Sequence, residues 1–306
     1  MSLNIGQLFH LQGSLFLMIL AGVVLKRMGI LDASGKKTLT DLCVDIVIPC
    51  NIIKSFLVDF QPDVLRACGT LLAVGFLLQI LCVLFNKFLF NRYLDQQKKV
   101  LQYCTIVSMA GFLGNPVAEG VFGNLGLLYT SMFLIPMRVV MWSAGTSYFV
   151  AGSTDKRKVI KNILTHPCLV AVYLGVLLMV TQLPLPNMLV SAIKSVGGCN
   201  SALTMFIIGT ILADVKLTTI VNPTTVAFSV FRLGILPLFA YGVSLLFQLE
   251  PVARGIAVLM TGMPAGATAA IFAARYDSDA PFATRCVVLT TLLSMFTLPL
   301  WCMAVV

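Results

Sequence analysis

The sequence predicts an all-helical protein that crosses a membrane many times. Of its 306 residues, 58% are hydrophobic and 11% are charged, and the mean hydropathy is +0.96. A soluble domain of this size carries about a quarter charged residues, because they must cover its surface. The second observation is that apolar runs long enough to cross the hydrocarbon core as helices follow one another along the chain. These runs do not alternate with period two, which excludes a transmembrane β-barrel.

Ten such segments are expected to form transmembrane helices, five in each half of the chain. Each has about the 20 apolar residues that span a bilayer as a helix. The first is expected to be retained and not cleaved, because no basic stretch precedes it and a membrane domain follows. The segments cover residues 6–28, 38–58, 64–90, 100–123, 126–150, 167–182, 188–213, 225–247, 252–275 and 280–303.

Lys and Arg residues are concentrated in alternate loops between these segments. Such an excess marks the cytoplasmic loops of membrane proteins, so we expect both termini outside the cell membrane. The opposite loops hold only Arg66 and Arg254. Since the basic residues lie between apolar runs, the net charge of +9 does not indicate a nucleic-acid partner. The basic loops contain Lys26, Arg27, Lys36, Lys37, Lys87, Arg92, Lys98, Lys99, Lys156, Arg157, Lys158, Lys161, Lys216 and Arg275.

The nine cysteines and two histidines have no spacing typical of a metal site or an enzyme. Most cysteines lie inside apolar runs without a CxxC pair, so we interpret them as small apolar residues. His10 and His166 lie near predicted membrane boundaries, and the chain has no HExxH, GxSxG or phosphate-loop motif. We therefore expect neither an enzyme nor an ATP-driven pump, and no cofactor or metal.

The predicted helices divide near residue 156 into two groups of five. An odd number makes the second group enter the membrane from the other side, so the two groups form an inverted repeat. Two weak echoes support the repeat: Asn51 and Asn200 each follow a cysteine, and Pro116 and Pro264 lie 148 residues apart. The expected organisation is a first repeat at 1–150, a cytoplasmic loop at 151–165 and a second repeat at 166–306.

The fourth and ninth predicted helices are each interrupted near their middle. In the fourth, Asn115 is a suitable N-cap and Pro116 a suitable first helical residue. The ninth is expected to restart at Pro264 in the opposite direction. Two positive half-helix ends would then meet near the membrane centre, where transporters use them to hold anionic groups. The alternative is that these prolines only kink helices embedded in lipid.

Charged residues inside the spans are candidate functional groups, because each costs about 2.5 to 3.5 kcal/mol at the bilayer centre. Arg138, in the middle of the fifth span, is expected either to contact the anion or to pair with Asp45 or Glu119. These two acids are also the candidates for proton coupling. The interrupted stretches 109–118 and 259–270 contain no acid, which disfavours a carboxylate-rich sodium site. Residues closer to helix ends, expected to reach the interface, are Lys54, Lys194 and Arg285.

Two asparagines in the second and seventh predicted helices complete the candidate site. Asn51 and Asn200 are expected either to donate hydrogen bonds to a substrate or only to satisfy neighbouring backbone groups. The full set of predicted substrate-binding residues is Gly114, Asn115, Pro116, Met263, Pro264, Gly266, Thr268, Asn51, Asn200 and Arg138.

Several short motifs occur in an order typical of one family. They are Ile48-Pro49-Cys50, Gly114-Asn115-Pro116, His166-Pro167 to Leu174-Gly175, Gly209 to Ala213, and Met263-Pro264 through Arg275-Tyr276 to Pro299. With these motifs the whole chain resembles the auxin efflux carrier family, which includes bacterial malate and malonate permeases and plant PIN-FORMED carriers. The resemblance implies ten helices, a crossing of helices 4 and 9 at the substrate site, and a homodimer formed through a scaffold of helices 1, 2, 6 and 7.

The chain also departs from the family's usual pattern. Met109 stands where relatives often have asparagine, Asn115 replaces an apolar residue, and His166 replaces an asparagine before Pro167. The central loop at 151–165 is short, so the chain looks most like a prokaryotic-type member. These differences put the identity of the substrate in doubt.

The function expected from the sequence is transport of a small organic anion, such as a carboxylate or an auxin-like compound, across the cell membrane. An inverted repeat indicates alternating access, with helices 3 to 5 and 8 to 10 moving as an elevator against helices 1, 2, 6 and 7. The competing hypothesis is a membrane sensor that binds a small ligand with the same fold and does not transport it.

Overall fold

The computed structural model describes residues 5–57, 61–149, 157, 160–161, 164–213, 220–276 and 278–305. Within these ranges the regular structure is helical, apart from one isolated antiparallel bridge between Ser108 and Ala265. The prediction of an all-helical protein is therefore confirmed. Of the predicted loop at 151–165, the described residues Arg157, Ile160, Lys161 and Leu164 are helical. Lys156, Lys158 and Lys216 lie outside the described residues.

The first half of the chain forms helices that match the predicted segments closely. They are α1 (Ile5–Arg27), α2 (Ala33–Leu42), the π-helical turn η1 (Cys43–Val47), α3 (Ile48–Phe56), α4 (Pro62–Leu89), α5 (Asp95–Ile106), the 3-10 turn η2 (Met109–Gly111), α6 (Gly114–Val140), the π-helical turn η3 (Met141–Gly145) and α7 (Thr146–Phe149).

The second half follows a similar scheme. Its elements are α9 (Pro167–Thr181), α10 (Asn187–Gly198), α11 (Asn200–Ala213), α12 (Pro223–Val230), the π-helical turn η5 (Phe231–Ile235), α13 (Leu236–Leu246), α14 (Pro251–Thr261), α15 (Thr268–Arg275) and α16 (Ala280–Val305). Four of the described helices begin with proline, whose missing N–H is not needed in the first turn; they are α4, α9, α12 and α14.

Among the residues that the structure describes, five stretches of helix are long and apolar enough to cross a membrane. They are Pro62–Leu89, Gly114–Phe149, Asn187–Ala213, Pro223–Leu246 and Ala280–Val305. The second of these contains Gly123, whose φ of +64° and ψ of −154° interrupt the helix. Because only glycine adopts such a conformation readily, the chain turns there, between two of the predicted segments. The chain is thus a polytopic helical membrane protein.

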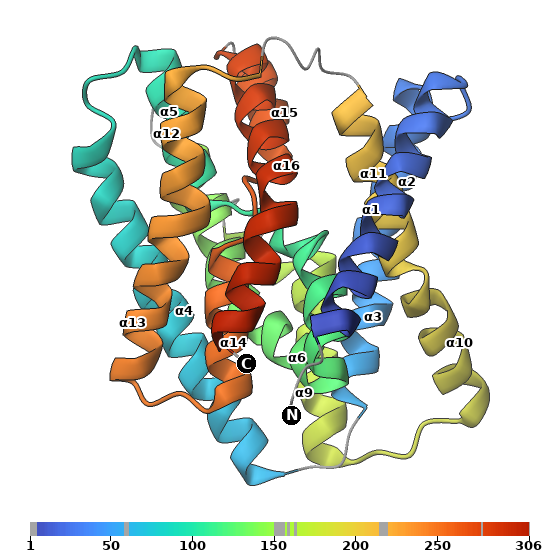
Figure 1. Cartoon of the computed structure of the whole chain (residues 1–306). Helices are drawn as coiled ribbons and strands as arrows, with labels where there is room; N and C mark the ends of the chain where they lie inside the picture. The colour runs from blue at the N-terminus through green and yellow to red at the C-terminus, as the bar shows by residue number, and fades with distance from the viewer. Residues whose placement is uncertain are drawn as a thin grey trace.

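The helices pack as two groups, which Figure 1 shows side by side. In the first, here called the scaffold group, α1 lies along α11, and α3 lies against α9 and α10. In the second, here called the bundle group, α6 packs against α4 and α14, and α16 packs against α12, α14 and α15. Contacts of α3 with α6 and of α1 with α16 join the two groups.

Inside the scaffold group, α1 and α11 approach closely at glycines. A Cβ atom added to Gly209 would lie 2.2 Å from the Ile19 carbonyl oxygen and 2.7 Å from Gly22 Cα. A Cβ atom on Gly22 would lie 2.4 Å from the Phe206 carbonyl oxygen. Small residues at such a contact let two membrane helices pack through their backbones.

We predict that Gly209→Val lowers the stability of the purified protein by about 1 to 3 kcal/mol or more, because the added atoms overlap backbone that cannot move aside. Thermal unfolding in detergent measures the change. Gly69→Ala on α4 is the control, because no atom lies within 4 Å of a Cβ atom there. An unfolding temperature for Gly209→Val equal to that of the wild type would contradict the close packing.

Two π-helical turns, η1 and η5, each lie just before a proline in the first turn of the next helix. Pro49 is the second residue of α3, and Pro237 is the second residue of α13. A proline inside a helix lacks the donor for the preceding turn and its ring clashes with that turn. The wider π turn relieves the clash, and such turns often occur at functional sites. Asp45 lies in η1 and Arg232 lies in η5.

Candidate functional site

Two helix interruptions meet inside the bundle group. The first separates α5 from α6 at residues 107–113, and the second separates α14 from α15 at residues 262–267. Met109 N donates to Pro264 O at 2.8 Å, and Gly266 N donates to Val107 O at 3.0 Å. These two bonds flank the antiparallel bridge between Ser108 and Ala265. We call residues 107–113 and 262–267 the paired breaks.

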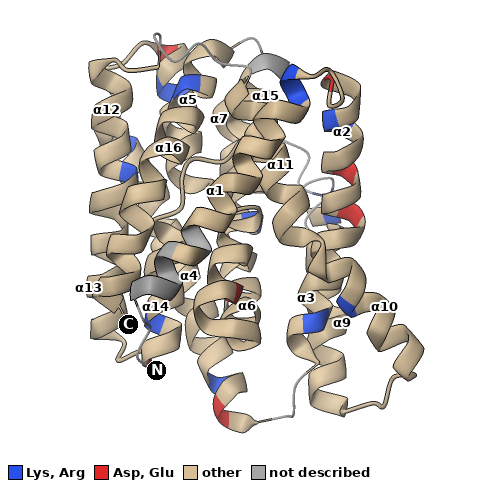
Figure 2. Ribbon diagram, turned by 45° about the vertical axis from the view of Figure 1, so that its right-hand side comes forward, with Lys and Arg blue, Asp and Glu red and all other residues tan. Residues whose placement is uncertain are grey.

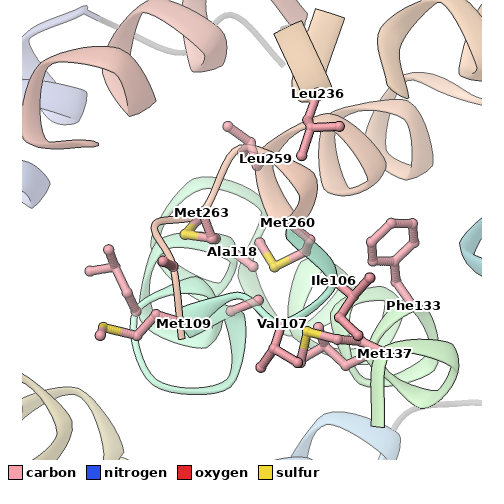
Figure 3. Packing of buried hydrophobic residues seen from close by; sticks show 14 of the residues in the cluster. Ile106, Val107, Met109, Ala118, Phe133, Met137, Leu236, Leu259, Met260 and Met263 are labelled. Atoms are coloured by element: carbon pink, nitrogen blue, oxygen red, sulfur yellow. The ribbon is translucent and has the colours of Figure 1, made fainter. Parts of the chain in front are cut away.

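Apolar side chains pack tightly around the paired breaks. Figure 3 shows Met263 and Ala118 beside Met260, with Met109 and Val107 in the same cluster of buried side chains. All five side chains are almost completely buried. The breaks are therefore held in a packed interior, which explains how irregular backbone can exist at membrane depth.

Two glycines allow the breaks to come this close. A Cβ atom added to Gly114 would lie 2.7 Å from Met260 Sδ, and one added to Gly266 would lie 2.9 Å from Val107 Cγ1. Both glycines belong to the predicted site. Their role in the structure is to permit close packing between the two breaks.

Side chains tie the second break to its neighbours. Ala265 N donates to Thr290 Oγ1 on α16 at 3.1 Å, and the Tyr103 hydroxyl on α5 donates to Thr268 Oγ1 at 3.0 Å. Thr268 is the first residue of α15. The start of α15 is thereby fixed to α5, on the other side of the paired breaks.

The structure corrects where the half-helices begin. Helix α6 begins at Gly114 with Leu113 as its cap residue, so Asn115 is not the N-cap and Pro116 is the third helical residue. Helix α15 begins at Thr268 and not at Pro264, whose carbonyl instead accepts from Met109 N. Pro116 and Pro264 therefore do not occupy equivalent positions in the two breaks. The reason is that backbone bonds between the breaks, and not local capping, decide where each helix restarts.

A cavity of about 310 Å³ lies beside the paired breaks, between the bundle and scaffold groups. Most of its lining is apolar, and of the predicted site residues only Thr268 lines it. The start of α15 contributes this threonine and its neighbours, so the cavity meets a helix N-terminus. The lining residues are Lys36, Thr40, Met109, Phe112, Ile207, Ile208, Ile211, Ala267, Thr268, Ala270, Ile271, Thr284 and Val287.

Three buried asparagines have side chains without any hydrogen-bond partner in the described part of the chain. Asn51, Asn115 and Asn200 are at most 1% exposed, and both the oxygen and the nitrogen of each carboxamide are unpaired. A buried polar group without a partner costs free energy, and native proteins rarely keep one without reason. These side chains are therefore the strongest candidates to bind something that the chain itself does not supply.

The packing indicates that these asparagines lie around one junction of helices. A Cβ atom on Gly197 would lie 2.9 Å from Asn51 Cα, so the end of α10, just before Asn200, touches α3 there. Residues three or four apart share one face of a helix. Asn51 and Asn115 thus lie one turn from Lys54 and Glu119, which contact each other.

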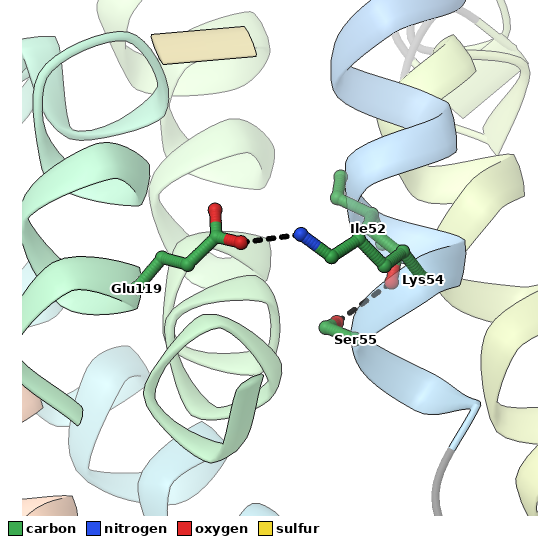
Figure 4. A network of polar contacts seen from close by, with 4 residues as sticks. All are labelled: Ile52, Lys54, Ser55 and Glu119. Carbon is green, nitrogen blue, oxygen red and sulfur yellow. Dashed lines mark hydrogen bonds and ion pairs between the residues drawn. The ribbon is translucent and has the colours of Figure 1, made fainter. Parts of the chain in front are cut away.

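Figure 4 shows the ion pair between Lys54 of α3 and Glu119 of α6. The Lys54 Nζ to Glu119 Oε1 distance is 2.5 Å, and the side chains are 18% and 26% exposed. This pair joins the scaffold group to the bundle group. Lys54 was expected to reach the membrane interface alone, and Glu119 was considered as a partner of Arg138; the structure corrects both expectations.

Arg138 lies on α6, where its side chain is 5% exposed and its Nη1 has no hydrogen-bond partner. Its guanidinium lies close enough to His166 and Cys168, both at the start of α9, to interact with them electrostatically. Among the described residues, neither Asp45 nor Glu119 forms an ion pair with it. Asp45 is exposed but close enough to interact electrostatically with Cys168. Arg138 is also not among the residues that line the cavity.

Some residues of this region could not be identified from the sequence. Phe112, Ile207 and Thr40 line the cavity, but each looks like an ordinary apolar or helical residue in its own segment. Met109 was noted only as a departure from a family pattern. Because the cavity lies between segments far apart in the sequence, no local signal identifies its lining.

The sequence is similar to a family of membrane proteins and to two transporters of archaea. A family described as "Membrane transport protein" matches residues 13–159 and 155–302. An "Uncharacterized transporter" of Methanothermobacter thermautotrophicus is 27% identical over 293 residues, covering 94% of this chain and 95% of that protein. A second uncharacterized transporter, from Methanocaldococcus jannaschii, is 24% identical over 299 residues, covering 93% of this chain and 94% of that protein. Neither description names a substrate.

Proposed function

Since the chain belongs to the membrane transport protein family of the auxin efflux carrier type, we propose that it is a secondary or facilitative transporter of a small organic anion. The observation that carries this proposal is the set of unpaired carboxamides of Asn51, Asn115 and Asn200. Asn115 is the second residue of α6, directly after the first break. The amides of all three residues can donate to a carboxylate that the protein itself does not contain.

The proposed architecture has ten spans in two inverted halves, with helices 4 and 9 crossing at the paired breaks. Helix 4 consists of α5 and the start of α6, and helix 9 consists of α14 and α15. Figure 2 supports one orientation, because basic residues gather at the end of the molecule near α2, α5 and α15. By the positive-inside rule this end faces the cytoplasm and both termini face outward.

The cavity supports an organic substrate with an apolar body. Its lining includes Met109, Phe112 and Ile207, which would contact such a body, while Thr268 begins α15. A helix N-terminus attracts negative charge, by about 0.3 to 1 kcal/mol at an exposed site and more where water is excluded. A substrate with a carboxylate and an apolar body therefore suits this cavity better than a cation or a sugar.

The two helix groups support alternating access. The cavity reaches Lys36, Thr40 and Thr284, at the basic end of the molecule, and we propose that the described conformation is the one accessible from the cytoplasmic side. Lys54 and Glu119 join the two groups on the far side of the asparagines. We propose that the bundle group moves against the scaffold group as an elevator, breaking this ion pair to open the outer side.

Three further assignments belong to the same proposal. Glu119 is a candidate for proton coupling because protonation would release Lys54, and Asp45 remains a candidate because of its place in η1. Arg138 is proposed to set a positive potential near the start of α9. A homodimer through the scaffold group would leave the bundle group free to move.

A flux measurement tests this function. Purified protein in liposomes is expected to accumulate labelled mono- or dicarboxylates faster than protein-free liposomes, with saturation and with competition by unlabelled carboxylate. A panel of organic cations serves as the control. Binding of a carboxylate without any flux would favour the sensor, and flux of cations alone would overturn the proposed substrate class.

A further inference from the structure

Arg232 is the most deeply buried arginine that contacts the paired breaks. It lies in η5, halfway along the stretch Pro223–Leu246, and is 3% exposed. A charged side chain at this depth is costly unless its donors are satisfied. Sequence reasoning gave it no role, because its partners lie 31 and 127 residues away in the chain.

The Arg232 guanidinium donates hydrogen bonds to backbone carbonyls of the two interrupted helices. Arg232 Nε donates to Met263 O at 3.0 Å, and Nη1 donates to Thr105 O at 2.6 Å. Met263 follows the end of α14, and Thr105 is the penultimate residue of α5. One cation therefore spans the C-terminal ends of the two half-helices that lead into the paired breaks.

These helix ends need positive charge. The last carbonyls of a helix have no partner within it, and each end carries about half a negative charge. Membrane transporters with broken helices use such carbonyls and helix ends to coordinate a coupling cation. In this chain, stretches 109–118 and 259–270 contain no acidic residue that would help to hold a metal cation. The guanidinium already occupies the place where the carbonyls point.

Pro237 and Trp301 together shape the π turn that holds Arg232. Pro237 has no N–H to donate to the carbonyl of Leu233, four residues earlier. The Trp301 indole on α16 supplies the missing donor, with Nε1 at 2.8 Å from Leu233 O. The Leu233 carbonyl is thus satisfied without the arginine, whose Nε and Nη1 donate to Met263 O and Thr105 O.

We propose that Arg232 is a positioning residue that acts as a resident cation. It neutralises the ends of α5 and α14, keeps the paired breaks in register, and replaces a bound metal cation in the transport cycle. This inference rests on the proposed function for its transport readout, but its structural part is independent of any substrate.

The test combines Arg232→Ala with chemical rescue by guanidinium ion. A cysteine pair, Ser108→Cys with Ala265→Cys, reports the register of the breaks, because residues opposite each other in such a bridge suit a disulfide. We expect Arg232→Ala to reduce disulfide formation several-fold and to abolish carboxylate uptake. Millimolar guanidinium, but not sodium or potassium, is expected to restore part of both.

Two further variants keep the test decisive if Arg232→Ala fails to fold. Arg232→Lys keeps the charge but its single ammonium cannot bridge both carbonyls as a fork, so disulfide formation is expected to fall while the protein stays folded. Trp301→Phe is the control, because it removes the indole on α16 that donates to Leu233 O in η5 but keeps Arg232. It is expected to show no response to guanidinium.

Several outcomes would overturn the proposal. One is wild-type disulfide formation in both Arg232 variants, and another is an equal guanidinium response in Trp301→Phe. Wild-type uptake that requires sodium or potassium would also contradict a resident cation. If disulfide formation behaves as expected but no carboxylate is transported by the wild type, the proposed function fails and the positioning role stands.

Discussion

A reversible covalent link between positions 54 and 119 is expected to stop transport. The variant carries Lys54→Cys and Glu119→Cys, joined by a bifunctional thiosulfonate reagent of matching length. In the structure the two side chains join α3 of the scaffold group to α6 of the bundle group. If the bundle must move to open the outer side, a link at this place holds the protein in one conformation. Carboxylate uptake by liposomes is expected to fall to the protein-free level and to return, after reduction, to the level of the same double variant before linking.

The matched control is a link inside the bundle group. A disulfide between Ser108→Cys and Ala265→Cys joins the paired breaks to each other, and these belong to the same group. Because this link does not join the two groups, we expect its oxidation to reduce uptake far less than the link between positions 54 and 119. Full transport by the linked 54/119 variant would show that the two groups do not separate there, and the elevator would be wrong.

Asn115→Leu is expected to weaken carboxylate binding without lowering stability. The carboxamide has no partner in the described chain, so its replacement by an apolar side chain of similar size leaves no other group unpaired. Loss of one hydrogen bond to a charged ligand corresponds to about 1.4 kcal/mol or more, which is about tenfold in affinity. Binding of a labelled carboxylate and thermal unfolding of the same preparation measure the two effects.

Asn86→Leu provides the control with the same substitution at a structural asparagine. Its Nδ2 donates to Gln102 O at 2.8 Å, and Gln102 Nε2 donates back to Asn86 O at 2.9 Å. Removing the Asn86 amide takes away the side-chain donor to the buried Gln102 carbonyl. We therefore expect the free energy of unfolding to fall by about 1 to 3 kcal/mol, with little change in carboxylate affinity. If Asn115→Leu instead behaves like Asn86→Leu, the amide has a structural role.

The helices could be predicted because hydrophobic length is a local property. The predicted segment 64–90, for example, corresponds to α4 at Pro62–Leu89. The turn at Gly123 falls between two predicted segments, where glycine permits a positive φ. The π-helical turns η1 and η5 were not predicted, because they arise from prolines inside spans that are otherwise continuous.

The place of each helix break was predicted, but its geometry was not. Asn115-Pro116 fits the rules for an N-cap followed by a first helical residue, yet α6 already begins at Gly114. The bond from Met109 N to Pro264 O joins residues 155 positions apart, and sequence patterns carry no information about such pairs. For the same reason the ion pair between Lys54 and Glu119 could not be predicted from the sequence.

The candidate site residues could likewise be named from the sequence, but their contacts could not be predicted. Asn51, Asn115 and Asn200 could be named as candidates, because polar residues in apolar spans are unusual. That all three lack partners is a property of the packed structure alone. Arg232 could not be assigned a role from the sequence, since that role depends on carbonyls of two other helices.

The central claim, that one cavity is exposed alternately to the two sides of the membrane, can be tested at Ala267. This residue lines the cavity and lies in the second break. Ala267→Cys in a background without other reactive cysteines is treated with an impermeant thiol reagent in right-side-out and in inside-out vesicles. We expect labelling from the cytoplasmic side, additional labelling from the outside once Glu119→Gln weakens the ion pair, and protection by carboxylate on both sides. Labelling from one side only, unchanged by Glu119→Gln and by carboxylate, would contradict alternating access.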